Sequence, residues 1–281
     1  MSTQSSGART PIAILTDFGY RDHYAGVVKG VITSICPQAP IIDLTHGIPP
    51  QQVLAGALAL REAVNFFPRR TIFLAVVDPG VGTDRKPIAV ATRTGPRLVG
   101  PDNGLLWLAA QRTEIKEIVE LRSPRYRLPK VSTSFHGRDV FAPAAAWLWR
   151  GVRMHELGPS LQSMTQIDPG AGILEKPAQL DGEIIYVDNF GNLITNISRV
   201  TFERFAHRFK QCRLSIRAER RAPICLCNAY AEAPRGAALA IFGSFDLLEI
   251  AVRDGSAATY FGAPLGTRVS IRAAGSKSTS R

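Results

Sequence analysis

The chain has 281 residues, of which 45% are hydrophobic and 20% are charged. It can therefore bury a sizeable core, in one large domain or two ordinary ones, and it contains no run of about 18 uncharged apolar residues that would suggest a membrane span. The formal net charge of +11 would suit nucleic-acid binding, but the basic residues are dispersed and no nucleic-acid-binding motif accompanies them. We therefore expect neither a membrane nor a nucleic-acid partner.

The chain ends and the four cysteines indicate in which compartment the protein is expected. Residues 1–10 contain no apolar segment, so we expect a disordered start without a secretory signal, and a frayed tail at 273–281. The cysteines are scattered, as is typical of small buried hydrophobes in a reducing cytoplasm, so a cytoplasmic protein is expected. Cys225 and Cys227 are too close for a Cys-x-x-Cys pair and no matching pair follows, so no zinc site is predicted.

Strand and helix patterns alternate in the first half of the chain. Apolar runs predict strands at 11–15, 39–43, 71–77, 87–91 and just before Val99. Helices are predicted at 24–35, 53–64, 105–110 and 138–150, the last with Pro143 near its first turn. This alternation predicts an α/β domain over 11–170, with a mostly parallel sheet covered by helices on both faces.

The pattern changes after residue 157. Residues 158–180 hold several Gly, Pro and Ser residues without periodicity, which predicts a linker. Short strands are then expected at 183–187, 193–197, 212–217, 238–242, 247–252 and 268–272. Their spacing predicts a small, all-β, barrel-like or sandwich domain over 171–272.

Polar residues cluster at the ends of three predicted elements. Asp17 follows the first strand, and Asp78 ends the apolar strand with Arg85 seven residues later. His136 lies just before a helix. Each could by itself be only a turn or cap residue, but ligands of open α/β sheets bind beyond the carboxyl ends of the strands. The residues alone therefore predict an α/β enzyme with a polar site at the sheet edge.

Several common motifs are missing from the sequence. It contains no G-x-G-x-x-G or G-x-x-x-x-G-K-[ST] pattern, which argues against a dinucleotide fingerprint or a Walker loop. It has no G-x-S-x-G elbow either, which argues against an acyl hydrolase. His23, His46 and His136 are too far apart in the sequence to indicate a metal centre. We expect no metal.

Seven blocks of sequence occur in a characteristic order. They are ILTDFGYRDHYAGVVKG, DLTH (43–46), VVDPGVGTDR (76–85), GPDNG (100–104), FHGRDVFAP (135–143), VDNFGNLITNI (187–197) and SFDLLEIAV (244–252). Together they resemble the S-adenosylmethionine hydroxide adenosyltransferase family, which is related to the fluorinase and chlorinase enzymes. The resemblance implies a Rossmann-like N-terminal domain, a β-barrel C-terminal domain, and a homotrimer with its site at the subunit interface.

The resemblance also implies a reaction, the hydrolysis of S-adenosylmethionine (SAM) to adenosine and L-methionine. The family's catalytic triad falls on Asp78, Arg85 and His136. Water or hydroxide would attack the ribose C5′, and either Asp78 or His136 would accept the proton. Arg85 would orient them or hold the incipient hydroxide. The sulfonium is already an activated leaving group, so neither metal nor cofactor is implied.

The implied substrate contacts come from both halves of the chain. They are Asp17 for the ribose hydroxyls, Asp188 for the methionine ammonium, Asn192 for the adenine edge, Phe190 and Tyr230 for stacking on adenine, Ser244 for the methionine carboxylate, and the backbone near Glu249 and Val252 for the base.

Two alternatives stand beside the hydrolase. A halogenase on the same scaffold would carry an aromatic residue in place of Asp78 and a serine in place of Gly137, and the Asp78 carboxylate would repel a halide. The segment after Arg85 is also too short for the fluorinase loop. A non-catalytic SAM or adenosine sensor would tolerate a degenerate triad, whereas all three triad positions are intact.

Overall fold

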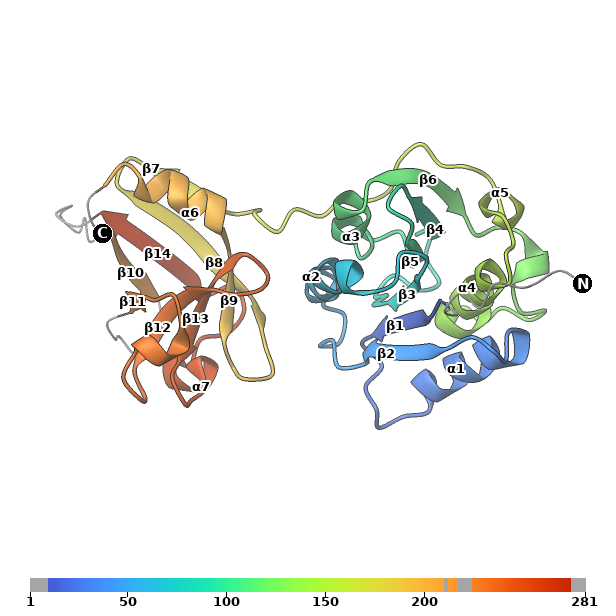
Figure 1. The fold of residues 1–281 in the computed structure, drawn as a ribbon, viewed down its shortest axis with the longest axis horizontal. Coiled ribbons are helices and arrows are strands. Elements are labelled where there is room, and N and C mark those ends of the chain that lie inside the picture. The colour runs from blue at the N-terminus through green and yellow to red at the C-terminus, as the bar shows by residue number, and fades with distance from the viewer. Residues whose placement is uncertain (1–9, 210–211, 217–223, 274–281) are drawn as a thin grey trace, which may run out of the picture. The chain divides into compact units, whose positions relative to one another are not determined.

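The computed structural model describes residues 10–209, 212–216 and 224–273, and divides after Ile167 into two compact units (Figure 1). Of the disordered start expected at residues 1–10 and the tail expected at 273–281, all but Thr10 and Ala273 lie outside the described residues. Within the described ranges, no helix combines the length and apolar character needed to cross a membrane.

The first unit contains a six-stranded sheet. Its strands are β1 (Ile12–Thr16), β2 (Ile41–Thr45), β3 (Ile72–Val76), β4 (Pro87–Thr92), β5 (Arg97–Pro101) and β6 (Ile115–Glu120). Their order in the sheet is β2-β1-β3-β5-β4-β6. The first four in that order run parallel, and β4 runs antiparallel to both its neighbours. The prediction of a mostly parallel sheet is confirmed.

Helices cover both faces of this sheet (Figure 1). They are α1 (Tyr24–Ile35), α2 (Val53–Ala63), α3 (Trp107–Arg112), α4 (Ala142–Trp149) and the short α5 (Met154–Leu157), with a π-helical turn at Gly137–Phe141 directly before α4. α1 packs against α4, and α2 packs against α3. Pro143 lies in the first turn of α4, as predicted. The π-helical turn was not predicted.

The core of the first unit explains why its central strands could be predicted. Every residue of β1 and β3 is buried, and all of them except Thr16 are apolar. The hairpin between β4 and β5 turns at Gly95, whose φ of 121° is left-handed. A side chain there would press on the carbonyl oxygen of Arg69, at 2.5 Å from the new Cβ.

The second unit is a nearly closed, barrel-like sheet. Its strands are β7 (Leu174–Lys176), β8 (Gln179–Val187), β9 (Leu193–Ser198), β10 (Cys212–Ile216), β11 (Cys225–Leu226), β12 (Ala238–Phe242), β13 (Leu247–Val252) and β14 (Arg268–Ala273), with helices α6 (Arg199–Ala206) and α7 (Ala257–Phe261). The strand order is β10-β14-β8-β9-β13-β12-β11, with β7 beside β8. A bridge between Leu214 and Ile224 connects the two ends of the sheet. The all-β, barrel-like prediction is confirmed.

Part of the predicted linker is not a linker. β7 and the start of β8 lie within residues 158–180, where the sequence showed no strand pattern. All three residues of β7 are exposed, so this edge strand has no buried face to produce an apolar alternation. The helices α6 and α7 of the second unit were not predicted either.

Candidate active site

Asp17 and Asp78 lie at the same edge of the first sheet, beyond the carboxyl ends of two adjacent strands. Thr16 of β1 pairs with Val76 of β3 in a parallel register, and the two aspartates follow these strand ends. A cavity of about 260 Å³ opens at this edge. It is lined by Asp17, Phe18, Gln51, Val76, Asp78, Pro79, Val81, Ser134, Phe135, His136 and Gly137. The strand-end location expected for the polar site is therefore found, and His136 lines the same cavity as both aspartates.

Arg85 joins the other two predicted triad residues. Its guanidinium forks onto the Asp78 carboxylate, with Nε donating to Oδ1 at 2.8 Å and Nη2 donating to Oδ2. The same Nη2 donates to Nδ1 of His136 at 2.9 Å. The Arg85 and Asp78 side chains are only 8% and 6% exposed, so this ion pair is screened little by water. The third nitrogen, Nη1, is buried without a hydrogen-bond partner in the described chain.

The contact with Arg85 settles where the His136 ring carries its proton. A guanidinium can only donate hydrogen bonds, so Nδ1 of His136 must accept one. The ring is therefore neutral, with its proton on Nε2, while this bond exists. Burial, together with the positive charge of Arg85, lowers the pKa of His136 below its ordinary value of 6.5. Geometry and electrostatics agree on a neutral imidazole.

The loop between Asp78 and Arg85 is held by its neighbours. Asn103 Nδ2, just beyond β5, donates to the carbonyl of Val77 at 2.9 Å. Gly82 adopts a left-handed φ of 81°, and a Cβ there would lie 2.5 Å from the carbonyl oxygen of Thr133. A glycine is thus required at position 82, where this loop passes the segment that leads to His136.

Asp17 is held by a residue that the sequence did not indicate. The backbone N–H of Gln51 donates to its Oδ2 at 2.9 Å, and Gln51 itself has a left-handed φ of 65°. Burial raises the pKa of Asp17, the Gln51 hydrogen bond opposes the rise, and the negative charge of Asp78 adds to it. No pattern in the sequence marks Gln51, because its contribution comes from the backbone.

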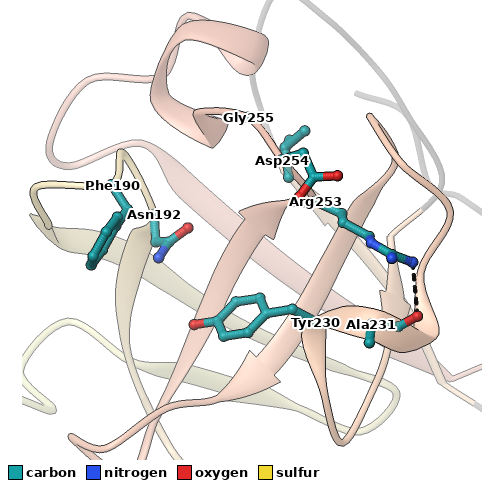
Figure 2. A pocket seen from close by; sticks show the side chains of 8 residues that line it. Phe190, Asn192, Tyr230, Ala231, Arg253, Asp254 and Gly255 are labelled. Atoms are coloured by element: carbon teal, nitrogen blue, oxygen red, sulfur yellow. Dashed lines mark hydrogen bonds between the residues drawn. The ribbon is translucent and has the colours of Figure 1, made fainter.

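The second unit has its own cavity, of about 620 Å³ (Figure 2). Four predicted substrate-binding residues line it, namely Phe190, Asn192, Tyr230 and Val252, together with Ala231, Arg253, Asp254 and Gly255. Figure 2 shows the Tyr230 ring extending toward Phe190 and Asn192. Phe190 is 76% exposed, so one large aromatic face is available to a planar ligand.

The other three predicted contacts of this unit are placed differently. Asp188 accepts hydrogen bonds from the backbone N–H of Phe190 and from the backbone and side chain of Asn192, at 2.8 to 2.9 Å. Glu249 is buried and accepts a hydrogen bond from the Tyr230 hydroxyl at 2.5 Å. Ser244 lies in the exposed turn between β12 and β13, apart from the residues that line the cavity. Asp188 and Glu249 thus orient lining residues.

Within residues 10–209, 212–216 and 224–273, no three His, Cys, Asp or Glu side chains are grouped so that they could hold a metal ion.

The sequence and the fold both match known proteins. The SAM hydroxide adenosyltransferase N-terminal domain model matches residues 12–158, and the C-terminal domain model matches residues 182–270. A Thermus thermophilus protein named (R)-S-adenosyl-L-methionine hydrolase is 38% identical, covering 93% of this chain and 99% of that protein. A more distant relative, a fluorinase of Nocardia brasiliensis, is 25% identical over 96% of this chain and 99% of that protein.

Among solved structures, an uncharacterized conserved protein from Thermotoga maritima superposes with a TM-score of 0.81 at 35% identity. The match covers 92% of this chain and 99% of that one. The two domain models together account for most of the chain, and the seven sequence blocks lie within or directly beside them. The chain belongs to the SAM hydroxide adenosyltransferase family.

Proposed function

We propose that the protein is an S-adenosyl-L-methionine hydrolase, which converts SAM and water to adenosine, L-methionine and a proton. One observation carries the proposal: Asp78, Arg85 and His136 form a single hydrogen-bonded group at a cavity beyond the strand ends. The relatives at 36–38% identity that are named for this activity support it.

Asp78 is the group that we propose as proton acceptor. Each of its carboxylate oxygens accepts one hydrogen bond from Arg85 and retains a second lone pair for water. His136 has its only lone pair directed at Arg85. It can instead donate from Nε2 and orient the water. As the C5′–O bond forms and the C5′–S bond breaks, a proton leaves the water for Asp78 and neutral methionine departs.

Arg85 keeps the Asp78 carboxylate in place while this happens. Its buried charge would also stabilise developing hydroxide character on the water. Because a sulfonium is a good leaving group, the proposed reaction uses no metal and no cofactor. Asp17 would bind the two ribose hydroxyls, and Phe190 and Tyr230 would bind the adenine ring.

The assembly and location are proposed from the family resemblance. We propose a homotrimer with the site at the subunit interface, in the cytoplasm. Light scattering of the purified protein should give three times the mass of one chain. A monomer that hydrolyses SAM at full rate would contradict the trimer without affecting the proposed chemistry.

A halogenase on this scaffold is disfavoured by two residues. The buried negative charge of Asp78 would repel a halide. A Cβ at Gly137 would lie 3.2 Å from Cζ of Phe18 and 3.4 Å from Cε2 of Phe135, so the serine typical of halogenases would crowd these rings.

Product analysis tests the function directly. Purified protein is incubated with SAM, with and without chloride and fluoride, and the nucleosides are separated by chromatography. We expect adenosine and methionine in equal amounts, whichever halide is present. A 5′-halogenated adenosine would favour the halogenase, and unchanged SAM would favour the sensor.

The activity should survive mild acid. Protonated His136 could not accept the Arg85 hydrogen bond, so the neutral ring is the active form. Since the pKa of His136 is lowered, the neutral form persists as the pH falls through 6.5, and activity declines only below that value. The pH profile of kcat/KM for adenosine formation measures this. An acid limb with its midpoint above 6.5 would contradict the assigned protonation state.

A further inference from the structure

The DLTH block contains two residues that the proposed reaction does not use, Asp43 and His46. Both Thr16 and His46 have 0% of their surface exposed. Nδ1 of His46 lies 2.8 Å from the hydroxyl of Thr16, and Nε2 lies 3.2 Å from Oδ1 of Asp43, in a contact that is close but poorly aligned for a hydrogen bond. Lys29 donates to the other Asp43 oxygen at 2.6 Å. A buried histidine is thus held between a hydroxyl and a carboxylate.

The direction of these bonds follows from the charges. Burial lowers the pKa of His46, so the ring is neutral and has one N–H. A carboxylate facing Nε2 favours the proton on that nitrogen, which leaves Nδ1 as an acceptor. The Thr16 hydroxyl therefore donates to Nδ1, and it accepts the backbone N–H of Phe18 at 3.2 Å.

Threonine, histidine and aspartate are also the residue types of a hydrolytic triad, but their surroundings exclude that role. A nucleophile must reach a substrate, whereas Thr16 and His46 are fully buried. The described residues that line the 260 Å³ cavity include neither of them. Their hydrogen bonds instead hold the residues on either side of Asp17, namely Thr16 and Phe18.

The segment from His46 to Gln51 is hydrogen-bonded to the residues on both sides of Asp17 and to Asp17 itself. The backbone N–H of Gly19 donates to the carbonyl of His46 at 2.8 Å, and that of Ile48 donates to the carbonyl of Thr16 at 3.3 Å. The N–H of Gln51 holds the Asp17 carboxylate itself at 2.9 Å. The His46 side chain adds a side-chain hydrogen bond between this segment and Thr16, the residue preceding Asp17.

We propose that His46 is a positioning residue for ribose recognition: with Asp43 behind it, it fixes the Thr16 hydroxyl and so sets the Asp17 carboxylate for the ribose 2′ and 3′ hydroxyls. This inference rests on the proposed function only in assigning the ribose to Asp17. It predicts that His46 acts on affinity for those hydroxyls and not on the chemical step.

Two ligands separate this role from a general loss of structure. Adenosine carries both ribose hydroxyls, and 2′,3′-dideoxyadenosine carries neither. Calorimetry should show that His46→Leu binds adenosine about tenfold more weakly, the equivalent of roughly one hydrogen bond, with unchanged affinity for the dideoxy compound. His46→Asn, which keeps an acceptor near the Nδ1 position, should recover part of the preference. In the SAM assay, KM should rise while kcat stays within about twofold.

A second variant and a control variant distinguish the proposed role from a folding defect. Thr16→Val removes the hydroxyl and keeps the shape, so it should lose the same preference for adenosine. His155→Asn, an exposed histidine in α5, should change neither affinity. Equal weakening of both ligands in His46→Leu and Thr16→Val, or no change in either, would overturn the proposal. Binding needs no turnover, so a wild type that prefers adenosine but leaves SAM intact would refute the hydrolase alone.

Discussion

Replacing Asp78 with asparagine is expected to lower kcat for adenosine formation about 10²- to 10⁴-fold, the usual range for loss of a general base. The amide matches the carboxylate in size but cannot take a proton from water, and its NH₂ group would face the donors of Arg85. The adenosine contacts proposed for Asp17, Phe190 and Tyr230 are untouched. The affinity for adenosine, measured by calorimetry, should therefore change much less than kcat.

An aspartate-to-asparagine substitution at a neighbouring residue is the control for Asp78→Asn. Asp84 is in the same loop but is exposed, so Asp84→Asn should keep wild-type kcat. Removing one partner of a buried ion pair can cost about 3–5 kcal/mol of folding free energy, so thermal unfolding of Asp78→Asn must be measured as well. A folded Asp78→Asn protein that binds adenosine and turns over at the wild-type rate would show that Asp78 is not the proton acceptor.

The parts of the fold that could be predicted are those in which burial shapes the sequence. β1 and β3 are buried along their whole length, and their apolar runs predicted them. β6 at the edge of the sheet was missed, because Lys116, Glu117 and Glu120 interrupt its apolar residues. The exposed β7 was missed for the same reason. Edge strands face solvent, and their sequences resemble loops.

In the candidate site, the positions of residues along the chain could be predicted, but their hydrogen bonds to one another could not. The strand-end rule located Asp17 and Asp78 at one edge, because the end of a strand can be read from an apolar run. The fork of Arg85 onto Asp78, seven positions away, and its bond to His136, 51 positions away, depend on side-chain geometry that no periodicity encodes. Gln51 acts through its backbone N–H and left no signal at all.

In the second unit, the resemblance supplied residue identities without their contacts. Asp188 was expected to meet the methionine ammonium, yet three of its acceptor positions are used within its own loop. Burial raises the pKa of Glu249, the Tyr230 hydrogen bond opposes the rise, and the negative charge of Asp188 adds to it. Whether such a residue touches a ligand or orients a neighbour is decided by packing, which the linear sequence does not record.

Replacing Arg85 with lysine should lower kcat about 10²- to 10³-fold, as expected when a fixed electrostatic donor is lost. Lysine keeps the positive charge, but its ammonium is a single point on a flexible stem and cannot fork onto Asp78 while also donating to His136. His136 would lose the partner that fixes its tautomer. Without the guanidinium hydrogen bond to Nδ1, which only a neutral ring can accept, the pKa of His136 should rise.

The pH profile distinguishes this explanation from a simple loss of charge. If Arg85 holds His136 neutral, the acid limb of the residual Arg85→Lys activity should move to higher pH than in the wild type. Arg112→Lys makes the same change at an exposed ion pair with Glu62, and should leave both kcat and the profile unaltered. A large loss of kcat with an unshifted acid limb would mean that Arg85 acts on Asp78 and the water alone. Near-normal activity in Arg85→Lys would mean that charge suffices, and that the bidentate geometry seen here is not required for the reaction.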